Sequence, residues 1–142
     1  MMNKYEIDEE KSRELYEKYK GLIDKKMCYN NIFSIVSHNN SAFREGSLRV
    51  AYGYAEIPHR FLVRHCFIVD KETNKVLDPT IFALDSPVSE GAYFAFRVFE
   101  DTDEYLDAIM KNNLLPELYR VLSHEEKKAE KWALANGYLP VG

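Results

Sequence analysis

The stretch from residue 61 to residue 82 constrains the fold more than any other part of the chain. It reads "FLVRHCFIVDKETNKVLDPTIF", two runs rich in β-branched and aromatic residues joined by the polar loop "KETN". Such runs favour strands, and Asn74 suits the left-handed conformation that often ends a short loop. The stretch therefore predicts a β-hairpin, which commits the neighbouring chain to an antiparallel sheet.

The register of this hairpin decides which polar side chains meet. If Asp70 pairs with Lys75 across the loop, His65 lies opposite Thr80. Asp78 is then the diagonal neighbour of His65 on the same face of the sheet, within reach of its ring. A register shifted by one residue would place the two side chains on opposite faces.

Two further segments have the composition of strands. Residues 48–55 read "LRVAYGYA", and the glycine inside the run, Gly53, indicates a bulge or the close approach of another backbone. Residues 93–99 read "YFAFRVF" and are apolar on both sides. We therefore expect this second segment to be central in the sheet or covered by helices.

The remaining pattern is helical. Apolar residues recur at helical spacing over the first twenty residues, which end near Gly21, and again after Cys28 in "MCYNNIFSIVSHNNS". After Asp101 three segments are typical of helices: "DEYLDAIMKNN", "LPELYRVL" and "SHEEKKAEKWALANG", the last with Ser123 as a cap and Glu126 three residues on. Helices on both sides of a block of strands predict an α+β fold. We expect one domain over residues 1–142, with a core at about 25–100 and a helical part at about 101–137.

Composition excludes several classes of function. The chain has 142 residues, of which 46% are hydrophobic, and its 19 basic residues against 23 acidic ones give a net charge of −4. This balance argues against binding to nucleic acid. Neither a membrane-spanning apolar run nor the apolar core of a signal peptide is found in the sequence, so we expect a cytoplasmic protein that binds no membrane. Its two cysteines are too few for a disulfide framework.

Three side chains form a complete set for nucleophilic catalysis. A carboxylate such as Asp78 beside His65 fixes the tautomer of the ring and stabilises its protonated form, as a general base requires. Cys28 is expected at the start of a helix, where the positive end of the helix dipole stabilises a thiolate, and Lys25 and Lys26 add positive charge nearby. Cysteine, histidine and aspartate then act as nucleophile, base and orienting group. A structural His–Asp pair in a sheet is the alternative.

Other chemistries are less well supported by the sequence. The cysteines and histidines show no CxxC or HExxH spacing, so no zinc site and no metal cofactor is expected. The chain also lacks a glycine-rich phosphate loop and a GxSxG elbow. Successive side chains of a strand point to opposite faces, so Cys66 points away from the face of His65 and is expected in the core.

The order of these motifs resembles a known superfamily. The cysteine in "MCYNN", followed by "AYGYA", "RHCFIVD" and "VLDPT", is similar to the transglutaminase-like branch of the papain-like cysteine hydrolases, and to small bacterial and phage-associated domains of that type. The resemblance covers roughly residues 25–82. It implies an antiparallel sheet packed against an N-terminal catalytic helix, with Cys28 as nucleophile, His65 as general base and acid, and Asp78 as the orienting group.

The resemblance also suggests substrate-binding residues and shows two departures. Phe67 stands where such domains often carry tryptophan, and the chain contains no glutamine to complete the oxyanion hole. Besides the backbone N–H of Cys28, the donors expected to replace glutamine are Tyr29, Asn30 or Asn31. Phe67 and Tyr52 are expected beside the substrate.

Three functions remain open at this stage. The first is a cysteine-dependent acyl-transfer enzyme that needs no cofactor and acts on a protein or peptide-like amide by hydrolysis, deamidation or transamidation. The second is an inactive binding or inhibitor module of the same fold, encoded by a phage or mobile element, that uses exposed aromatic anchors. These anchors would be Tyr52, Tyr54, Tyr93 and Phe94. The third is a structural subunit with a core histidine.

Overall fold

The computed structural model describes residues 2–25, 27–38, 40–83 and 91–141. It has the α+β class that the sequence predicts, with a mainly antiparallel six-stranded sheet. The strands are β1 (Asn3–Tyr5), β2 (Leu48–Ile57), β3 (Phe61–Asp70), β4 (Lys75–Leu77), β5 (Tyr93–Val98) and β6 (Leu139–Val141). The α-helices are α1 (Glu9–Tyr19), α2 (Cys28–His38), α3 (Asn40–Arg44), α4 (Thr102–Lys111) and α5 (Ser123–Ala135). Short 3-10 helices are η1 (Lys20–Leu22), η2 (Pro58–Arg60) and η3 (Pro79–Ala83).

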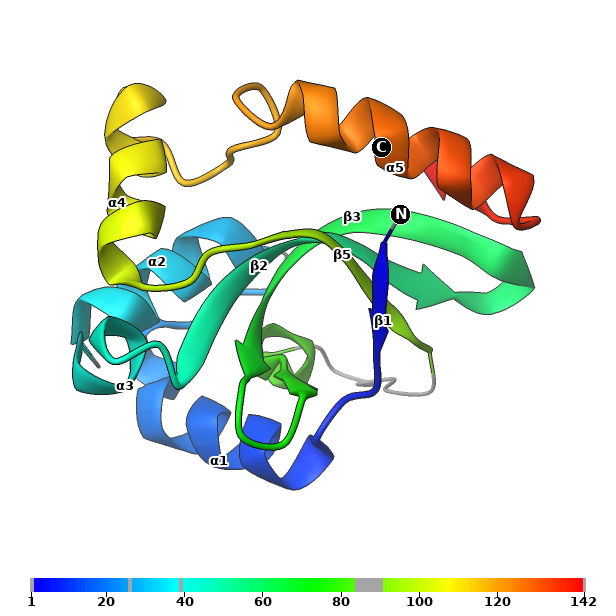
Figure 1. Ribbon diagram of the computed structural model, residues 1–142. Coiled ribbons are helices and arrows are strands. Elements are labelled where there is room, and N and C mark those ends of the chain that lie inside the picture. The colour runs from blue at the N-terminus through cyan, green and yellow to red at the C-terminus, as the bar shows by residue number, and fades with distance from the viewer. Residues whose placement is uncertain (1, 26, 39, 84–90, 142) are drawn as a thin grey trace.

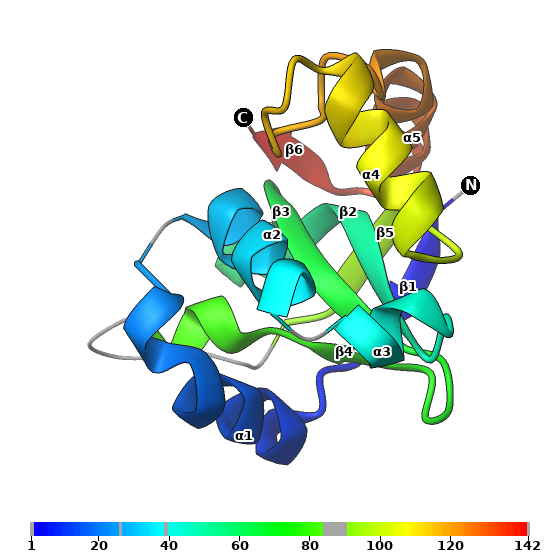
Figure 2. The same cartoon turned by 90° about the vertical axis from the view of Figure 1, so that its left-hand side faces the viewer.

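The helices lie on different sides of the strands. Helix α5 runs along one side of the sheet and α1 lies on the opposite side (Figure 1). After a quarter turn, α2 and α3 are seen in front of the strands, with α2 against β3 and α3 against β2 (Figure 2). Among the residues described, no helix is both long and apolar enough to cross a membrane.

The sheet curls until its two edges meet. Its strand order is β1-β5-β2-β3-β4, and Ile7, just after β1, bridges back to Val76 in β4. The N–H of Asp8 donates to the Val76 carbonyl at 2.8 Å, and the Val76 N–H donates to the Glu6 carbonyl at 2.8 Å. The strands therefore enclose a small barrel whose interior side chains fill the available space.

The inside and the outside of this barrel carry separate apolar clusters. Alternate residues of the strands point inward, and the interior is filled by Tyr5, Ala51, Phe67, Val69, Val76, Tyr93 and Ala95. The outward residues of the same strands pack under α2 and α4 or under α5. A polar group placed among the interior side chains is therefore largely shielded from water.

Gly53 has the role that its place in a strand suggests. The register between β2 and β5 shifts between Tyr52 and Gly53, which is a β-bulge. A Cβ atom added at Gly53 would overlap the backbone oxygen of Phe94 and would lie 2.8 Å from the Ala95 Cα. Only glycine allows β5 to approach so closely.

The N-terminal prediction is correct for the helix and wrong for its beginning. Helix α1 starts at Glu9, where the Asp8 side chain caps it by accepting from the Lys11 N–H at 3.0 Å. The residues before it form β1, because they add an edge strand to β5. Three residues are too few to show a period in the sequence.

The C-terminal prediction is also wrong in part. Residues 115–122, expected as a helix, form irregular structure and turns, because Asn113 and Leu114 just before them take left-handed φ angles of 56° and 66° and Pro116 follows. The expected Ser123 cap is not found: Leu122 occupies the cap position without a side-chain hydrogen bond. Strand β6 follows α5 and pairs in parallel with β3.

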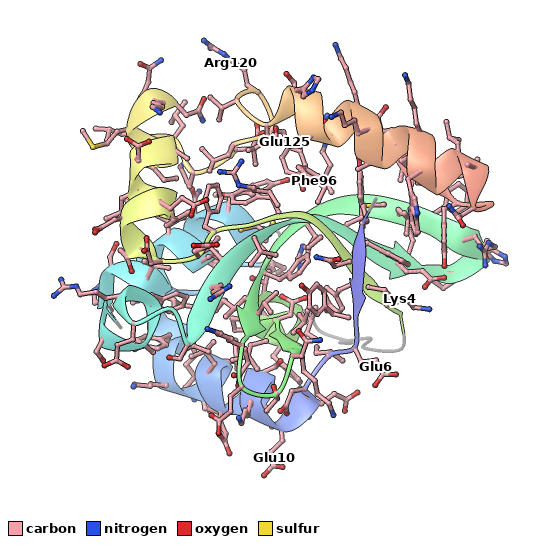
Figure 3. All side chains as sticks on the ribbon, in the orientation of Figure 1. Lys4, Glu6, Glu10, Phe96, Arg120 and Glu125 are labelled. Atoms are coloured by element: carbon pink, nitrogen blue, oxygen red, sulfur yellow. The ribbon has the colours of Figure 1, made fainter. Side chains whose placement is uncertain are left out.

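Glu126 links α5 to the sheet. Its two carboxylate oxygens each accept from the Arg64 guanidinium at 2.7 Å, and Oε2 also accepts from the Tyr54 hydroxyl at 3.1 Å. The bidentate contact fixes the orientation of α5 as well as its position. Nearby, Arg97 donates to Glu125 at 2.8 Å. The side chain of Phe96, a residue of β5, lies against Tyr119 in the segment that leads into α5 (Figure 3).

Candidate active site

Helix α2 begins at Cys28, as the sequence predicts. The preceding turn is held by Asn31, whose side-chain oxygen accepts from the Asp24 N–H at 3.0 Å and whose amide donates to the Asp24 carbonyl at 2.8 Å. The Asn31 N–H donates to the Met27 carbonyl at 2.8 Å, so Cys28 is the first residue of the helix. In the first turn of α2 the backbone N–H groups come before any carbonyl that the helix can offer them. Such a helix N-terminus favours the binding of an anion. Lys26 lies outside the described residues.

His65 and Asp78 are hydrogen bonded. The pairs Asp70–Lys75, Val69–Val76 and Ile68–Leu77 confirm the predicted hairpin register. Strand β4 ends at Leu77, and the next residue places its Oδ2 2.8 Å from the Nε2 of His65. Asp78 is fully buried, whereas the His65 side chain is 14% exposed. The pair therefore lies at the mouth of the barrel, with the ring nearer the solvent.

One detail of the register prediction is wrong. Thr80 does not face His65 across the hairpin, because β4 ends three residues earlier and Thr80 belongs to η3. Its hydroxyl instead accepts from the Asn31 amide at 3.1 Å. This bond ties the turn before Cys28 to the segment just after Asp78.

Other contacts fix the carboxylate. The Tyr93 hydroxyl donates to Asp78 Oδ2 at 2.6 Å, and the Asp78 N–H donates to the Ser12 hydroxyl of α1 at 2.9 Å. Asp78 Oδ1 is buried without a hydrogen-bond partner among the described residues. The Tyr93 hydroxyl and the His65 ring thus both bind Oδ2, and the negative charge is held directly beside the imidazole ring.

Cys28 completes the cluster. Burial by itself lowers the pKa of His65, but the Asp78 carboxylate and then a hydrogen bond with the Cys28 thiol outweigh it and raise the pKa to about 10. Because Nε2 is bonded to Asp78, Nδ1 is the ring nitrogen left for the thiol. A protonated imidazole between a carboxylate and a thiol is the arrangement that stabilises a thiolate.

Cys28 and the His65 ring belong to side-chain clusters on different faces of the sheet. Cys28 packs with Tyr52 and Cys66 on the outer face, whereas the His65 ring lies against the interior residues Phe67 and Tyr93. Strand β3 pairs with β6 over residues 61–63 and with β4 over residues 68–70. Between these stretches no other described strand pairs with this edge of β3, and the Cys28 thiol is near enough to help raise the pKa of His65 there.

Cys66 is a core residue, as expected. It is fully buried beside Tyr52 and Cys28, and burial raises the pKa of its thiol. A buried thiol kept neutral in this way is a poor nucleophile. Cys28 is buried as well, but it stands at the start of α2 and acts on the His65 ring, so it is the better placed of the two cysteines to react.

Tyr119 is a residue of this site that the sequence did not indicate. Its hydroxyl accepts from the His65 N–H at 3.1 Å and donates to the Gly53 carbonyl at 2.6 Å. Its ring packs edge-on against Tyr29, the residue after Cys28, with 5.7 Å between centroids. One side chain from the C-terminal segment thus contacts both the strand of the histidine and the helix of the cysteine. A tyrosine in a segment expected to be helical gives no sign of this role.

The predicted substrate-side residues have different positions. Asn30 is exposed and Tyr29 is half-buried, both in the first turn of α2. Asn31 is buried with its amide already engaged, so it holds the turn in place. Phe67 is fully buried and lies against the His65 ring, while Tyr52 is fully buried and stacks on Tyr29.

The aromatic anchors expected for a binding module are not on the surface. Tyr52, Tyr54, Tyr93 and Phe94 are all buried, the most accessible of them 4% exposed. Tyr93 was expected to be an exposed anchor and instead binds Asp78, because its ring lies inside the barrel.

The pair of His65 and Asp78 should make stability depend on pH. The folded ring keeps a proton that the unfolded side chain loses above its ordinary pKa of 6.5. The contribution of this proton to the free energy of unfolding is therefore complete below about pH 6.5 and is lost as the pH rises toward about 10. Urea unfolding of the wild type and of His65→Gln should show a stability difference that shrinks by more than about 1 kcal/mol over this range.

A matched control is His124→Gln, which removes an exposed histidine. The stability difference from the wild type should change with pH by less for this variant than for His65→Gln. A constant difference for His65→Gln as well would show that the ring is not protonated in the folded state.

No protein-family model, curated protein or solved structure matches the chain.

Proposed function

We propose that this protein is a cysteine-dependent acyl-transfer enzyme that acts on an amide bond of a protein or peptide-like substrate. One observation carries the proposal: His65 Nε2 lies 2.8 Å from Asp78 Oδ2, and the thiol of Cys28, the first residue of α2, is near enough to the same imidazole to help raise its pKa. The placement of this cysteine at a helix start beside a small antiparallel barrel also supports the resemblance to the transglutaminase-like and papain-like superfamily.

The arrangement suits a two-step reaction. In the first step, Cys28 Sγ forms a bond to the carbonyl carbon, and the C=O π electrons move to the oxygen. The developing oxyanion lies at the first turn of α2, where the N–H groups of Cys28 and Tyr29 precede the first carbonyl partner that the helix can offer them. When the carbonyl re-forms, the C–N bond breaks, and the His65 proton passes to the leaving amine.

The acyl-enzyme is then released by a second nucleophile. His65 accepts the proton of a water or an amine as that group attacks the thioester carbonyl, and Cys28 leaves as a thiolate. Water gives hydrolysis or deamidation, and an amine gives transamidation. Neither route requires a cofactor. A cytoplasmic, reducing compartment suits the two unpaired cysteines.

The thiol is expected to be reactive at a pH where ordinary thiols are not. At pH 6 a free cysteine is only about 0.3% thiolate. If His65 and Asp78 hold Cys28 as an ion pair, iodoacetamide should label it at least about tenfold faster in the folded protein than in urea. Labelling is measured by peptide mapping, and the buried Cys66 serves as an internal control.

Acyl transfer itself can be followed with a simple ester. Incubation with p-nitrophenyl acetate should give an acetyl group on Cys28 that intact-mass spectrometry detects and that Cys28→Ser does not acquire. Folded Cys28 that is labelled no faster than the unfolded thiol and forms no acyl-enzyme would refute the proposed function.

A further inference from the structure

A pocket opens beside the first turn of α2. It has a volume of about 310 Å³, and its lining includes Met27, Tyr29 and Asn30 on one side and Leu115, Pro116 and Arg120 on the other. The three residues on the first side surround Cys28 in the chain. Cys28 itself is buried and does not line the pocket, but the pocket begins at the residues directly before and after it, so a substrate residue beside the reacting carbonyl has this pocket within reach. Its volume lies at the lower end of the roughly 300–1,000 Å³ of small-molecule sites, which suits one side chain.

The side of the pocket that contains Leu115 and Pro116 is held in place by hydrogen bonds within the protein. The amide of Asn112, 7% exposed, donates to the carbonyls of Leu115 and Glu117, both at 2.9 Å. The buried Tyr52 hydroxyl donates to the Pro116 carbonyl at 2.5 Å. These bonds hold an irregular segment in one shape and attach it to β2. A preformed wall lowers the entropy lost when a ligand binds.

The surface of the pocket is mainly apolar. Met27 is 43% exposed and Leu115 is 61% exposed, although both side chains belong to types that are usually buried. The charged members are at the rim, where Arg120 extends away from the turn into solvent (Figure 3). The Glu117 carboxylate accepts from the Tyr119 N–H at 3.2 Å, so it too helps to hold the wall.

We propose that this pocket binds a large apolar side chain of the substrate, next to the amide bond that Cys28 attacks. The substrate class is thus a peptide or protein with an aliphatic or aromatic residue beside the reacting carbonyl. This inference rests on the proposed function, because the pocket selects substrates only if Cys28 is the nucleophile. Specificity comes from Leu115 and Pro116, outside the part of the chain that carries the Cys–His–Asp set.

The test compares two electrophiles that react at the same sulfur. Iodoacetamide and N-(2-phenylethyl)iodoacetamide both form an S–C bond with release of iodide, and only the second carries an apolar arm. The measured quantity is the ratio of their labelling rates at Cys28, divided by the same ratio for free cysteine. We expect this relative ratio to be at least about 10 for the wild type, because burying the aromatic ring of the arm in the pocket favours binding by at least about tenfold.

Two substitutions locate the effect. Leu115→Arg places a charge in the pocket and should reduce the relative ratio to within about threefold of unity. Leu134→Arg is the matched control, since Leu134 on α5 is 58% exposed and does not line the pocket. This control should keep the wild-type ratio. A series of arms from methyl to phenylethyl on the wild type gives the same information if Leu115→Arg does not fold.

The outcomes separate the two proposals. If iodoacetamide labels folded Cys28 no faster than unfolded Cys28, the proposed function fails. If iodoacetamide reacts fast but the apolar arm gives no advantage, or Leu134→Arg loses it equally, the pocket proposal fails alone. It also fails if the wild type is a dimer that Leu115→Arg dissociates, because a second copy then covers the pocket.

Discussion

Replacement of Asp78 by asparagine is expected to slow the iodoacetamide labelling of Cys28 at pH 6 by about 100-fold. The Asp78 charge is the largest influence that keeps His65 protonated against the effect of burial. Without that charge, burial dominates and the pKa of His65 falls. Once this pKa lies about two units below the labelling pH of 6, only about one ring in a hundred is an imidazolium. The thiolate then loses its partner.

The same substitution should also destabilise the fold. An asparagine whose oxygen still accepts from Tyr93 and His65 places its NH₂ where Asp78 Oδ1 has no partner among the described residues. A buried donor without a partner costs about 1–3 kcal/mol. Circular dichroism must therefore show a folded protein before the labelling rate is interpreted.

A matched control is Tyr93→Phe, which removes one hydrogen bond to the same oxygen but leaves the carboxylate. We expect it to slow labelling less than about tenfold, because the charge beside His65 remains. Labelling of folded Asp78→Asn within twofold of the wild type would show that the carboxylate does not support the thiol.

The second large effect is expected from the smallest change, Gly53→Ala. The new Cβ would overlap the Phe94 carbonyl and lie 2.8 Å from the Ala95 Cα. Both contacts are with backbone, so β2 and β5 must separate at the bulge. The loss of stability should be about 3 kcal/mol or more, at the upper end of overpacking effects. Urea unfolding monitored by circular dichroism measures it.

Gly21→Ala is the control for this substitution. Gly21 lies in η1, and an added Cβ there has no atom within 4 Å among the described residues. Its effect should stay within about 1 kcal/mol of zero. Equal effects at the two positions would mean that the close approach at Gly53 is relaxed without cost.

The parts of the fold that the sequence predicted are those that local patterns specify. The hairpin from Phe61 to Leu77 and its register are correct, because its loop and the two runs of strand-forming residues are adjacent in the chain. The start of α2 at Cys28 and the contact of His65 with Asp78 follow from the same local rules.

The parts that were missed depend on partners far along the chain. Strand β1 has three residues and pairs with β5, and β6 contains Pro140 and pairs with β3. Neither shows the alternation that identifies a longer strand. The left-handed φ angles of Asn113 and Leu114, which end α4 and shape the pocket wall, fall on residues that also suit a helix.

Two residues of the site were missed for a related reason. Tyr93 and Tyr119 contribute through the hydroxyl at the end of the ring. In the sequence, such a tyrosine is not distinguishable from one in a core or an interface. Whether such a ring points inward depends on the closure of the barrel, which no short segment specifies.

The closure of the barrel also bears on when the site can form during synthesis. Asn3 pairs with Ala95, and Ile7 bridges to Val76, so the earliest residues made find their partners late. Cys28 leaves the ribosome long before Tyr119, which holds the backbone of His65. At about 5–20 residues per second this delay is roughly 5–20 s. During that time Cys28 lacks the surroundings that it has in the folded site, which form only when the distant segments have come together.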